Sequence, residues 1–218
     1  MTAWPTRQGT GDVRHTRLLA ALLGWYLLLW AVMAISPLDR RDWFLENILS
    51  VALVAVLAVT YRRFPFSLLS YGLMTVFLTL HTVAAHYTYS EVPAGSLLKD
   101  AMALERNHFD RVAHFAFGLL MTYPLREFLV RTVPLTGLWS YVLPVAVLLA
   151  LSGLFEIIES WVAQIVSPEL GHAYLGTQGD IWDAQQDMTV ALCGAILCMV
   201  LTAAVRKLAS AKSAASVQ

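Results

Sequence analysis

Three aspartates stand at the start of the last apolar segment of the chain. Asp180, Asp183 and Asp187 are spaced i, i+3 and i+7, and residues at that spacing share one face of a helix. The segment that they enter, from Val190 to Val205, is apolar enough to lie in lipid. Carboxylates at the mouth of a membrane helix are energetically expensive, which makes these three candidates for a functional site.

A carboxylate and an imidazole stand one helical turn apart earlier in the chain. Asp110 and His114 are i and i+4, so they project from the same face of a helix. Such a pair can bind one metal ion, or act as a base with its orienting partner. The structural alternative is that Asp110 caps its helix while His114 forms a hydrogen bond at the membrane interface.

Two glutamates are spaced i and i+3 in a strongly apolar stretch. Glu156 and Glu159 would repel each other there unless something neutralises them. A metal ion is one candidate, an arginine such as Arg106 or Arg111 is another, and a proton shared between the carboxylates is the third. The sequence leaves all three open.

Two histidines close the third apolar segment. His81 and His86 are five residues apart, so they point to different sides of an unbroken helix and cannot both bind one ion. We predict that His86 reaches the site while His81 packs within the protein.

Composition indicates the elements that position these residues. The chain is 58% hydrophobic and only 14% charged, with a mean hydropathy of +0.61, whereas charged residues make up about a quarter of a soluble domain. We predict an all-α, polytopic membrane helix bundle, forming a single domain over residues 1–218 with short disordered tails at about 1–16 and 210–218. About six apolar runs are long enough to cross a bilayer: Leu18–Ile35, Phe44–Tyr61, Phe66–Tyr87, Val112–Val130, Trp139–Ile165 and Met188–Val205.

Basic residues predict the orientation. With a cytoplasmic N-terminus, ten Lys and Arg residues are inside and five are outside, as the positive-inside rule favours. The C-terminus is then also cytoplasmic, and the long loops at 88–110 and 166–187 are extracytoplasmic. All the candidate residues lie near the outer ends of the last four spans, and the first two spans contribute none.

A glycine-containing loop precedes the last span. Gly176-Thr177-Gln178-Gly179 can form a tight turn that offers backbone N–H groups to an anion, or serve as a flexible connection. It lacks the Gly-Lys-Ser/Thr ending of a phosphate-binding loop, and the sequence contains no Gly-x-Ser-x-Gly, His-Glu-x-x-His or Cys-x-x-Cys motif.

Long motifs in the second half resemble a known family. Residues 105–118 (ERNHFDRVAHFAFG), 123–127 (YPLRE) and 174–188 (YLGTQGDIWDAQQDM) are similar to those of the YjdF family of uncharacterised bacterial inner-membrane proteins. The resemblance covers nearly the whole chain. It implies a multi-pass protein of the bacterial inner (plasma) membrane.

A looser resemblance links the second half to VanZ-like membrane proteins, which are associated with teicoplanin resistance. The residues that stand where that pattern expects them are Asp110, His114, Glu156, Asp180 and Asp183. Three others depart from it: Arg111 replaces Lys, Glu159 replaces Gln and Asp187 replaces Asn. The two additional acids favour a bound cation in this chain. Neither resemblance supplies a biochemical activity.

These observations predict a polar site that binds a divalent metal ion near the extracytoplasmic face. The expected ligands are His86, Asp110, His114, Glu156 and Asp183, with Glu159, Asp180 and Asp187 as general base or supporting residues. Imidazole and carboxylate ligands suit zinc, manganese or iron. Such an ion would activate water for hydrolysis or transfer on a lipid or lipid-linked envelope substrate.

Two other function classes remain. The first is a proton-coupled or ion-coupled carrier, for which inverted repeats would be typical but none is visible. The second is a membrane scaffold without catalytic activity, in which Arg106 and Arg111 neutralise the acids. A nucleic-acid partner is not expected, because the formal net charge is zero and the sequence has no basic stripe.

Overall fold

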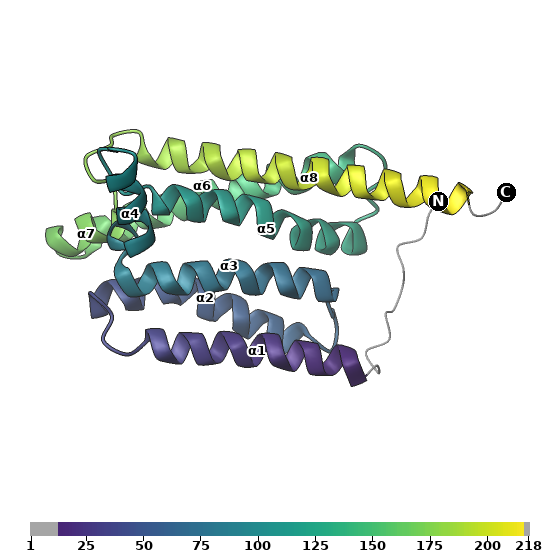
Figure 1. Ribbon diagram of the computed structural model, residues 1–218, viewed down its shortest axis with the longest axis horizontal. Helices are drawn as coiled ribbons and strands as arrows, with labels where there is room; N and C mark the ends of the chain where they lie inside the picture. Colours follow the sequence, from purple (N-terminus) through teal and green to yellow (C-terminus); the bar gives the residue numbers. More distant parts are fainter. Residues whose placement is uncertain (1–12, 216–218) are drawn as a thin grey trace.

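The computed structural model describes residues 13–215, and over that range the chain forms a bundle of α-helices (Figure 1). The elements are α1 (Val13–Met33), α2 (Arg40–Thr60), α3 (Leu68–Tyr87), the 3-10 helix η1 (Tyr89–Glu91), α4 (Pro93–Ala101), α5 (Phe109–Thr132), α6 (Trp139–Ile165), α7 (Pro168–Leu175) and α8 (Asp183–Ala215). No strand occurs between residues 13 and 215. The predicted all-α class is confirmed.

Each predicted span corresponds to one of the long helices, and Trp139–Ile165 agrees with α6 at both ends. Within the described residues, α1, α2, α3, α6 and α8 are long and apolar enough to cross a membrane. The sixth, α5, has 24 residues and runs beside them through the bundle (Figure 1). Its Asp, Glu and Arg residues lie near its two ends, and residues 112–125 carry none. We therefore treat α5 as a sixth spanning helix.

Both predicted tails are partly helical. Residues 13–16 begin α1 and residues 210–215 end α8. The second of these segments is rich in Ala, which favours helix even at a surface. The remaining tail residues, 1–12 and 216–218, lie outside the described part of the chain. The 33-residue α8 extends beyond the rest of the bundle (Figure 1).

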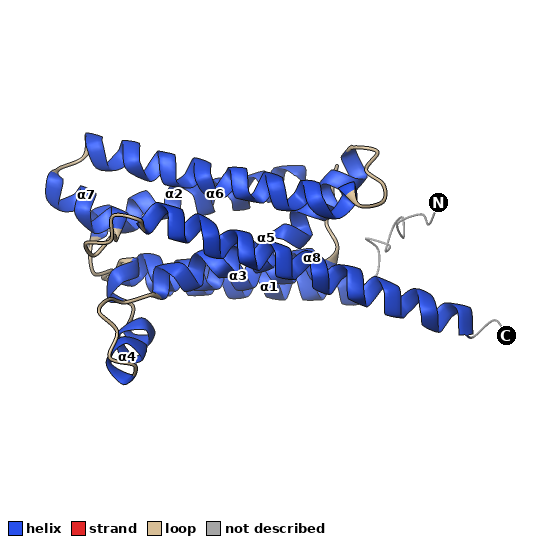
Figure 2. Ribbon diagram, turned by 90° about the horizontal axis from the view of Figure 1, so that it is seen from above, coloured by secondary structure: helices blue, strands red, loops and turns tan. Residues whose placement is uncertain are grey.

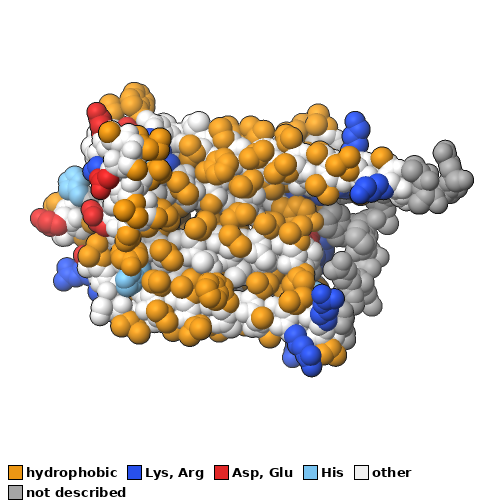
Figure 3. Space-filling model, viewed as in Figure 1, with side chains coloured by type: hydrophobic (Ala, Val, Ile, Leu, Met, Phe, Trp, Pro, Cys, Tyr) orange, Lys and Arg blue, Asp and Glu red, His pale blue; other side chains and the backbone are white. Residues whose placement is uncertain are grey.

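The short helices and the acidic helix ends gather at one end of the bundle. α4 and α7 lie there, beside the C-terminal ends of α3 and α6 and the N-terminal ends of α2, α5 and α8 (Figures 1 and 2). We call this the acidic end. A space-filling view shows an apolar belt between the ends, with the visible Asp and Glu side chains mostly at the acidic end (Figure 3).

Helices α5 and α8 form the closest packing in the bundle. A Cβ atom on Gly118 of α5 would overlap the backbone of Ala191 and Ala195, and one on Gly194 of α8 would overlap the backbone of Phe115 and Leu119. Small residues that allow backbones to approach are typical of helix pairs in membranes. This contact fixes how the first turns of α5 and α8, which carry the candidate residues, face each other.

A buried carboxylate joins α5 to the start of α3 at the opposite end. Glu127 is 1% exposed and accepts hydrogen bonds from the Ser67 backbone N–H (2.8 Å) and hydroxyl (2.7 Å). It also accepts from the Ser70 hydroxyl (2.5 Å) and from Nη1 of Arg131 (2.8 Å). A negative charge at the N-terminus of α3 is favoured by the helix dipole. Glu127 therefore acts as an interhelical cap.

Exposed positions at the two ends of the bundle can report the orientation of the protein. In a background without Cys193 and Cys198, Ala94→Cys and Glu169→Cys introduce exposed thiols at the acidic end, and Ser210→Cys introduces one at the other end. If the N-terminus is cytoplasmic, a membrane-impermeant maleimide should label the first two variants in intact spheroplasts and the third only after permeabilisation. The reverse pattern would place the acidic end in the cytoplasm.

Candidate functional site

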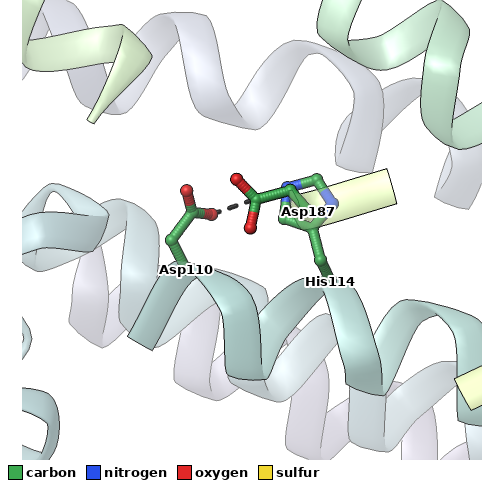
Figure 4. Close-up of side chains that lie close together, drawn as sticks. All are labelled: Asp110, His114 and Asp187. Carbon is green, nitrogen blue, oxygen red and sulfur yellow. Dashed lines mark ion pairs between the residues drawn. The ribbon is translucent and has the colours of Figure 1, made fainter. Parts of the chain in front are cut away.

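Helices α5 and α8 direct three ligating side chains toward one another. Asp110 and His114 come from the first two turns of α5, and Asp187 comes from the second turn of α8 (Figure 4). One potential ligand atom from each of the three lies within 4.8 Å of the others. His114 and Asp187 are buried, and Asp110 is half-buried. The two helices thus form a compact group with the composition of a metal site.

The imidazole of His114 lies between two carboxylates. Its Nε2 is 3.6 Å from Oδ1 of Asp110 and 3.7 Å from Oε1 of Glu156. The prediction that His114 and Glu156 approach each other is confirmed. Both distances exceed those of hydrogen bonds, but they resemble the spacing of about 3.4 Å between ligands that each lie about 2.1 Å from a tetrahedral ion.

Several atoms of this group are buried without a hydrogen bond. They are Nδ1 of His114, Oε1 of Glu156 and Oδ1 of Asp187. Buried polar atoms normally have a partner, and those without one require an explanation such as an ion or a water molecule. The three therefore mark an incomplete polar environment in the His114 group.

Two other aspartates of the motif pair with arginines instead. Arg106 Nη1 is 2.5 Å from Oδ1 of Asp183 and 3.4 Å from Oδ2 of Asp180, whereas Arg111 Nη2 is 3.3 Å and 2.6 Å from the same two atoms. Asp183 was predicted to be a metal ligand, but the structure directs it to the guanidinium groups. Arg111 Nε also lies 3.9 Å from Oδ1 of Asp187, so this network borders the His114 group.

The glycine-containing loop completes the arginine network. Arg106 donates to the carbonyl oxygens of Thr177 (3.0 Å) and Gly176 (3.5 Å), and Gly176 ends α7 with a φ of +59°. The loop therefore presents carbonyl oxygens to a cation, not N–H groups to an anion. The pKa of Asp180 is held below its usual value, first by the backbone N–H of Trp182 and then by Arg111. Asp180 thus acts as a charged structural partner in the loop, outside the His114 group.

The two histidines of α3 are engaged elsewhere. His86 Nδ1 is 2.8 Å from the carbonyl oxygen of Met33, so this predicted ligand tethers α3 to the end of α1. The structure does not bring it to the His114 group. His81 packs as predicted: its Nε2 is 3.0 Å from the carbonyl oxygen of Glu46, and its Nδ1 is 2.5 Å from the hydroxyl of Tyr89.

Helix α2 contributes two buried acids that the sequence interpretation missed. Asp42 is 1% exposed and Glu46 is 5% exposed, and each has one buried carboxylate oxygen without a hydrogen bond. The expectation that the first two spans contribute no site residue is wrong. The i, i+4 spacing of Asp42 and Glu46 at the start of an apolar run is the same signal that identified Asp110 and His114. The predicted span, however, began at Phe44 and left Asp42 outside.

Two tyrosines show how these acids are grouped. Burial raises the pKa of Tyr89 well above its usual value, and the charges of Glu46, Asp110 and Glu159 raise it further. Burial likewise raises the pKa of Tyr174, as do Glu46, Glu159 and Asp42. Glu159 therefore lies within electrostatic reach of both the α2 acids and the His114 group. The acidic end thus holds an arginine network, the His114 group, and the α2 acids Asp42 and Glu46 with Tyr89 and Tyr174.

The comparisons with known proteins agree with this architecture. The chain is 36% identical to the inner membrane protein YjdF of Escherichia coli (strain K12) over 170 residues, which cover 78% of this chain and 81% of the relative. No solved structure matches the chain significantly. The similarity of the second half to VanZ-like proteins stays a prediction from motif spacing. Residues 18–208 match the family described as "Predicted membrane protein (DUF2238)", and the chain therefore belongs to this family of integral membrane proteins.

Proposed function

We propose that this chain is an inner-membrane metalloprotein that performs hydrolysis or transfer on a lipid or lipid-linked envelope substrate. The divalent ion is held by Asp110, His114 and Asp187, with Glu156 as a fourth ligand. The observation that carries the proposal is the convergence of these ligand atoms from three helices. The membrane assignment follows the name of the Escherichia coli relative.

The electrostatics of the group favour a bound cation. Three carboxylates surround one imidazole in a setting of low dielectric, where unneutralised charge is costly. Arg111, an arginine that borders the group, donates a hydrogen bond to Asp180. Its Nε lies 3.9 Å from one oxygen of the group, Oδ1 of Asp187. A divalent ion would offset most of the remaining negative charge. Mixed imidazole and carboxylate ligands suit zinc, manganese or iron.

The surroundings of the group fit an apolar substrate. On α6, Ile157 follows Glu156 and Trp161 lies two residues beyond Glu159, and both side chains are exposed (48% and 61%). A lipid-linked substrate could therefore approach along α6. A bound ion would supply an activated water and polarise a phosphoryl or ester oxygen. Glu159 lies next to Glu156 on α6 and is the candidate proton acceptor.

The carrier hypothesis has an observation of its own. Asp42, Glu46 and Glu159 extend the acids beyond the His114 group toward Tyr89 and Tyr174, and a chain of carboxylates can relay protons. The scaffold hypothesis accounts for Asp180 and Asp183, whose charges the arginines neutralise. It does not account for the buried atoms of His114 and Glu156. Proton flux in proteoliposomes without added substrate would favour the carrier.

Metal binding is the direct test. The protein purified in mild detergent should contain about one equivalent of zinc, manganese or iron by elemental analysis. His114→Ala should lower the affinity by at least about a hundredfold, because removing even a supporting partner of a ligand costs about 10–100-fold. Glu156→Gln should lower the melting temperature in metal-replete buffer much more than in chelator.

The matched control is Asp180→Asn, which alters the neighbouring arginine network and leaves the proposed ligands intact. This variant should retain its metal. Equal melting temperatures with and without chelator, for native and substituted proteins alike, would exclude the metal site. Equal metal loss in Asp180→Asn would show that the ligands had been assigned wrongly.

A further inference from the structure

A basic cavity lies at the end of the bundle opposite the acidic end. It has a volume of about 400 Å³ and lies between the start of α6 and the C-terminal part of α8. Its polar lining consists of Ser140 and Tyr141 from α6, with Arg206, Lys207 and Ser210 from α8. None of the described residues that line it is acidic. This shallow, open cavity therefore has the charge to accept an anion.

A third cation lies directly behind the α6 wall of the cavity. Arg126 of α5 is 1% exposed, and its Nε donates to the carbonyl oxygen of Ser140 at 2.8 Å. Its guanidinium carbon is 4.7 Å from the centre of the Tyr141 ring. The two cavity residues Ser140 and Tyr141 are thus held in place by a buried positive charge. An anion in the cavity would be attracted by these cations.

Exposed apolar side chains lie on α6 and α8 at the level of the cavity, where a membrane surface is expected. Trp139 is 66% exposed beside Ser140, and Val205 and Leu208, which flank the basic pair, are 64% and 65% exposed. Tryptophan is enriched at the membrane interface. A free anion would need only the basic residues, whereas a lipid would also use these apolar neighbours. The position of the basic pair at the ends of helices with exposed apolar surfaces therefore favours a lipid over inorganic phosphate.

We propose that this cavity binds the phosphate-bearing head group of an anionic phospholipid. Arg206 and Lys207 contact the phosphate, the hydroxyl of Tyr141 faces the glycerol or head group, and the acyl chains extend along the exposed apolar surface of α6 and α8. Basic pockets between transmembrane helices bind anionic head groups in this way. The site lies at the other end of α5, α6 and α8 from the acids and does not depend on the proposed metal.

The test uses full-length protein in neutral detergent with added phosphatidylglycerol, phosphatidylcholine or inorganic phosphate. Phosphatidylglycerol alone should raise the melting temperature and remain bound in native mass spectrometry. The double variant Arg206→Gln/Lys207→Gln should bind it about 30-fold more weakly, because each basic residue near a membrane surface contributes roughly fivefold. The single variant Lys207→Glu, at an exposed position, should also lose the lipid-induced shift.

The matched control is Arg62→Gln/Arg63→Gln, which removes two exposed adjacent arginines at the same end but outside the cavity. This variant should keep the lipid-induced shift. Equal loss in both double variants would show general surface electrostatics and overturn the proposal. Stabilisation by inorganic phosphate without lipid, or by phosphatidylcholine as strongly as by phosphatidylglycerol, would overturn it as well.

Discussion

Gly118→Ala should destabilise the protein by about 2–3 kcal/mol, although alanine is normally the better helix former. The added Cβ would overlap the carbonyl of Ala191 and approach the backbone nitrogen of Ala195. Backbone atoms cannot rotate away as side chains do, so α5 and α8 must separate. The measurement is the melting temperature and the free energy of unfolding in detergent.

The control for this change is Gly72→Ala on α3, where a Cβ would meet nothing within 4 Å. It should be neutral or stabilising by up to about 1 kcal/mol, since it removes the conformational freedom of glycine. The two Gly→Ala substitutions thus have opposite expected signs. If both variants had the same stability, the close α5–α8 contact would be wrong, and the His114 group that it positions would lose its support.

Glu127→Ala should destabilise the protein by about 3–5 kcal/mol, the usual cost of removing one partner from a buried charged network. The change leaves the donors of Ser67 and Ser70, and the guanidinium of Arg131, without the acceptor they share. Glu127→Gln keeps one acceptor oxygen but turns an amide toward donors, so its effect should be intermediate. Thermal unfolding in detergent measures both.

The control for Glu127 is Glu105→Ala, because Glu105 is exposed at the other end of the bundle. Its effect should stay within about 0.5 kcal/mol. The melting temperature of Glu127→Ala should fall at every metal concentration, since the acid lies far along α5 from His114. A loss confined to metal-replete buffer would contradict a purely structural role for Glu127.

The sequence by itself determined the helices and the end at which the acids lie. Hydropathy over about 20 residues is a local property, and helical spacing places Asp110 beside His114 whatever else the chain does. Glu156 was expected beside His114 because the two residues lie near the same ends of their predicted spans. The fold class and the His114–Glu156 contact could therefore be predicted.

Only the tertiary structure decided which acids pair with an arginine and which join the His114 group. Asp183 and Asp187 stand a turn apart on one face of α8, yet the first meets Arg106 and the second meets the His114 group. That division depends on how α8 is rotated against α5, which the contacts at Gly118 and Gly194 determine. Likewise, Glu46 of α2 joins the acidic end through the packing of α2 on α3 and α7. Such long-range contacts depend on packing between helices distant in sequence, and no local pattern encodes them.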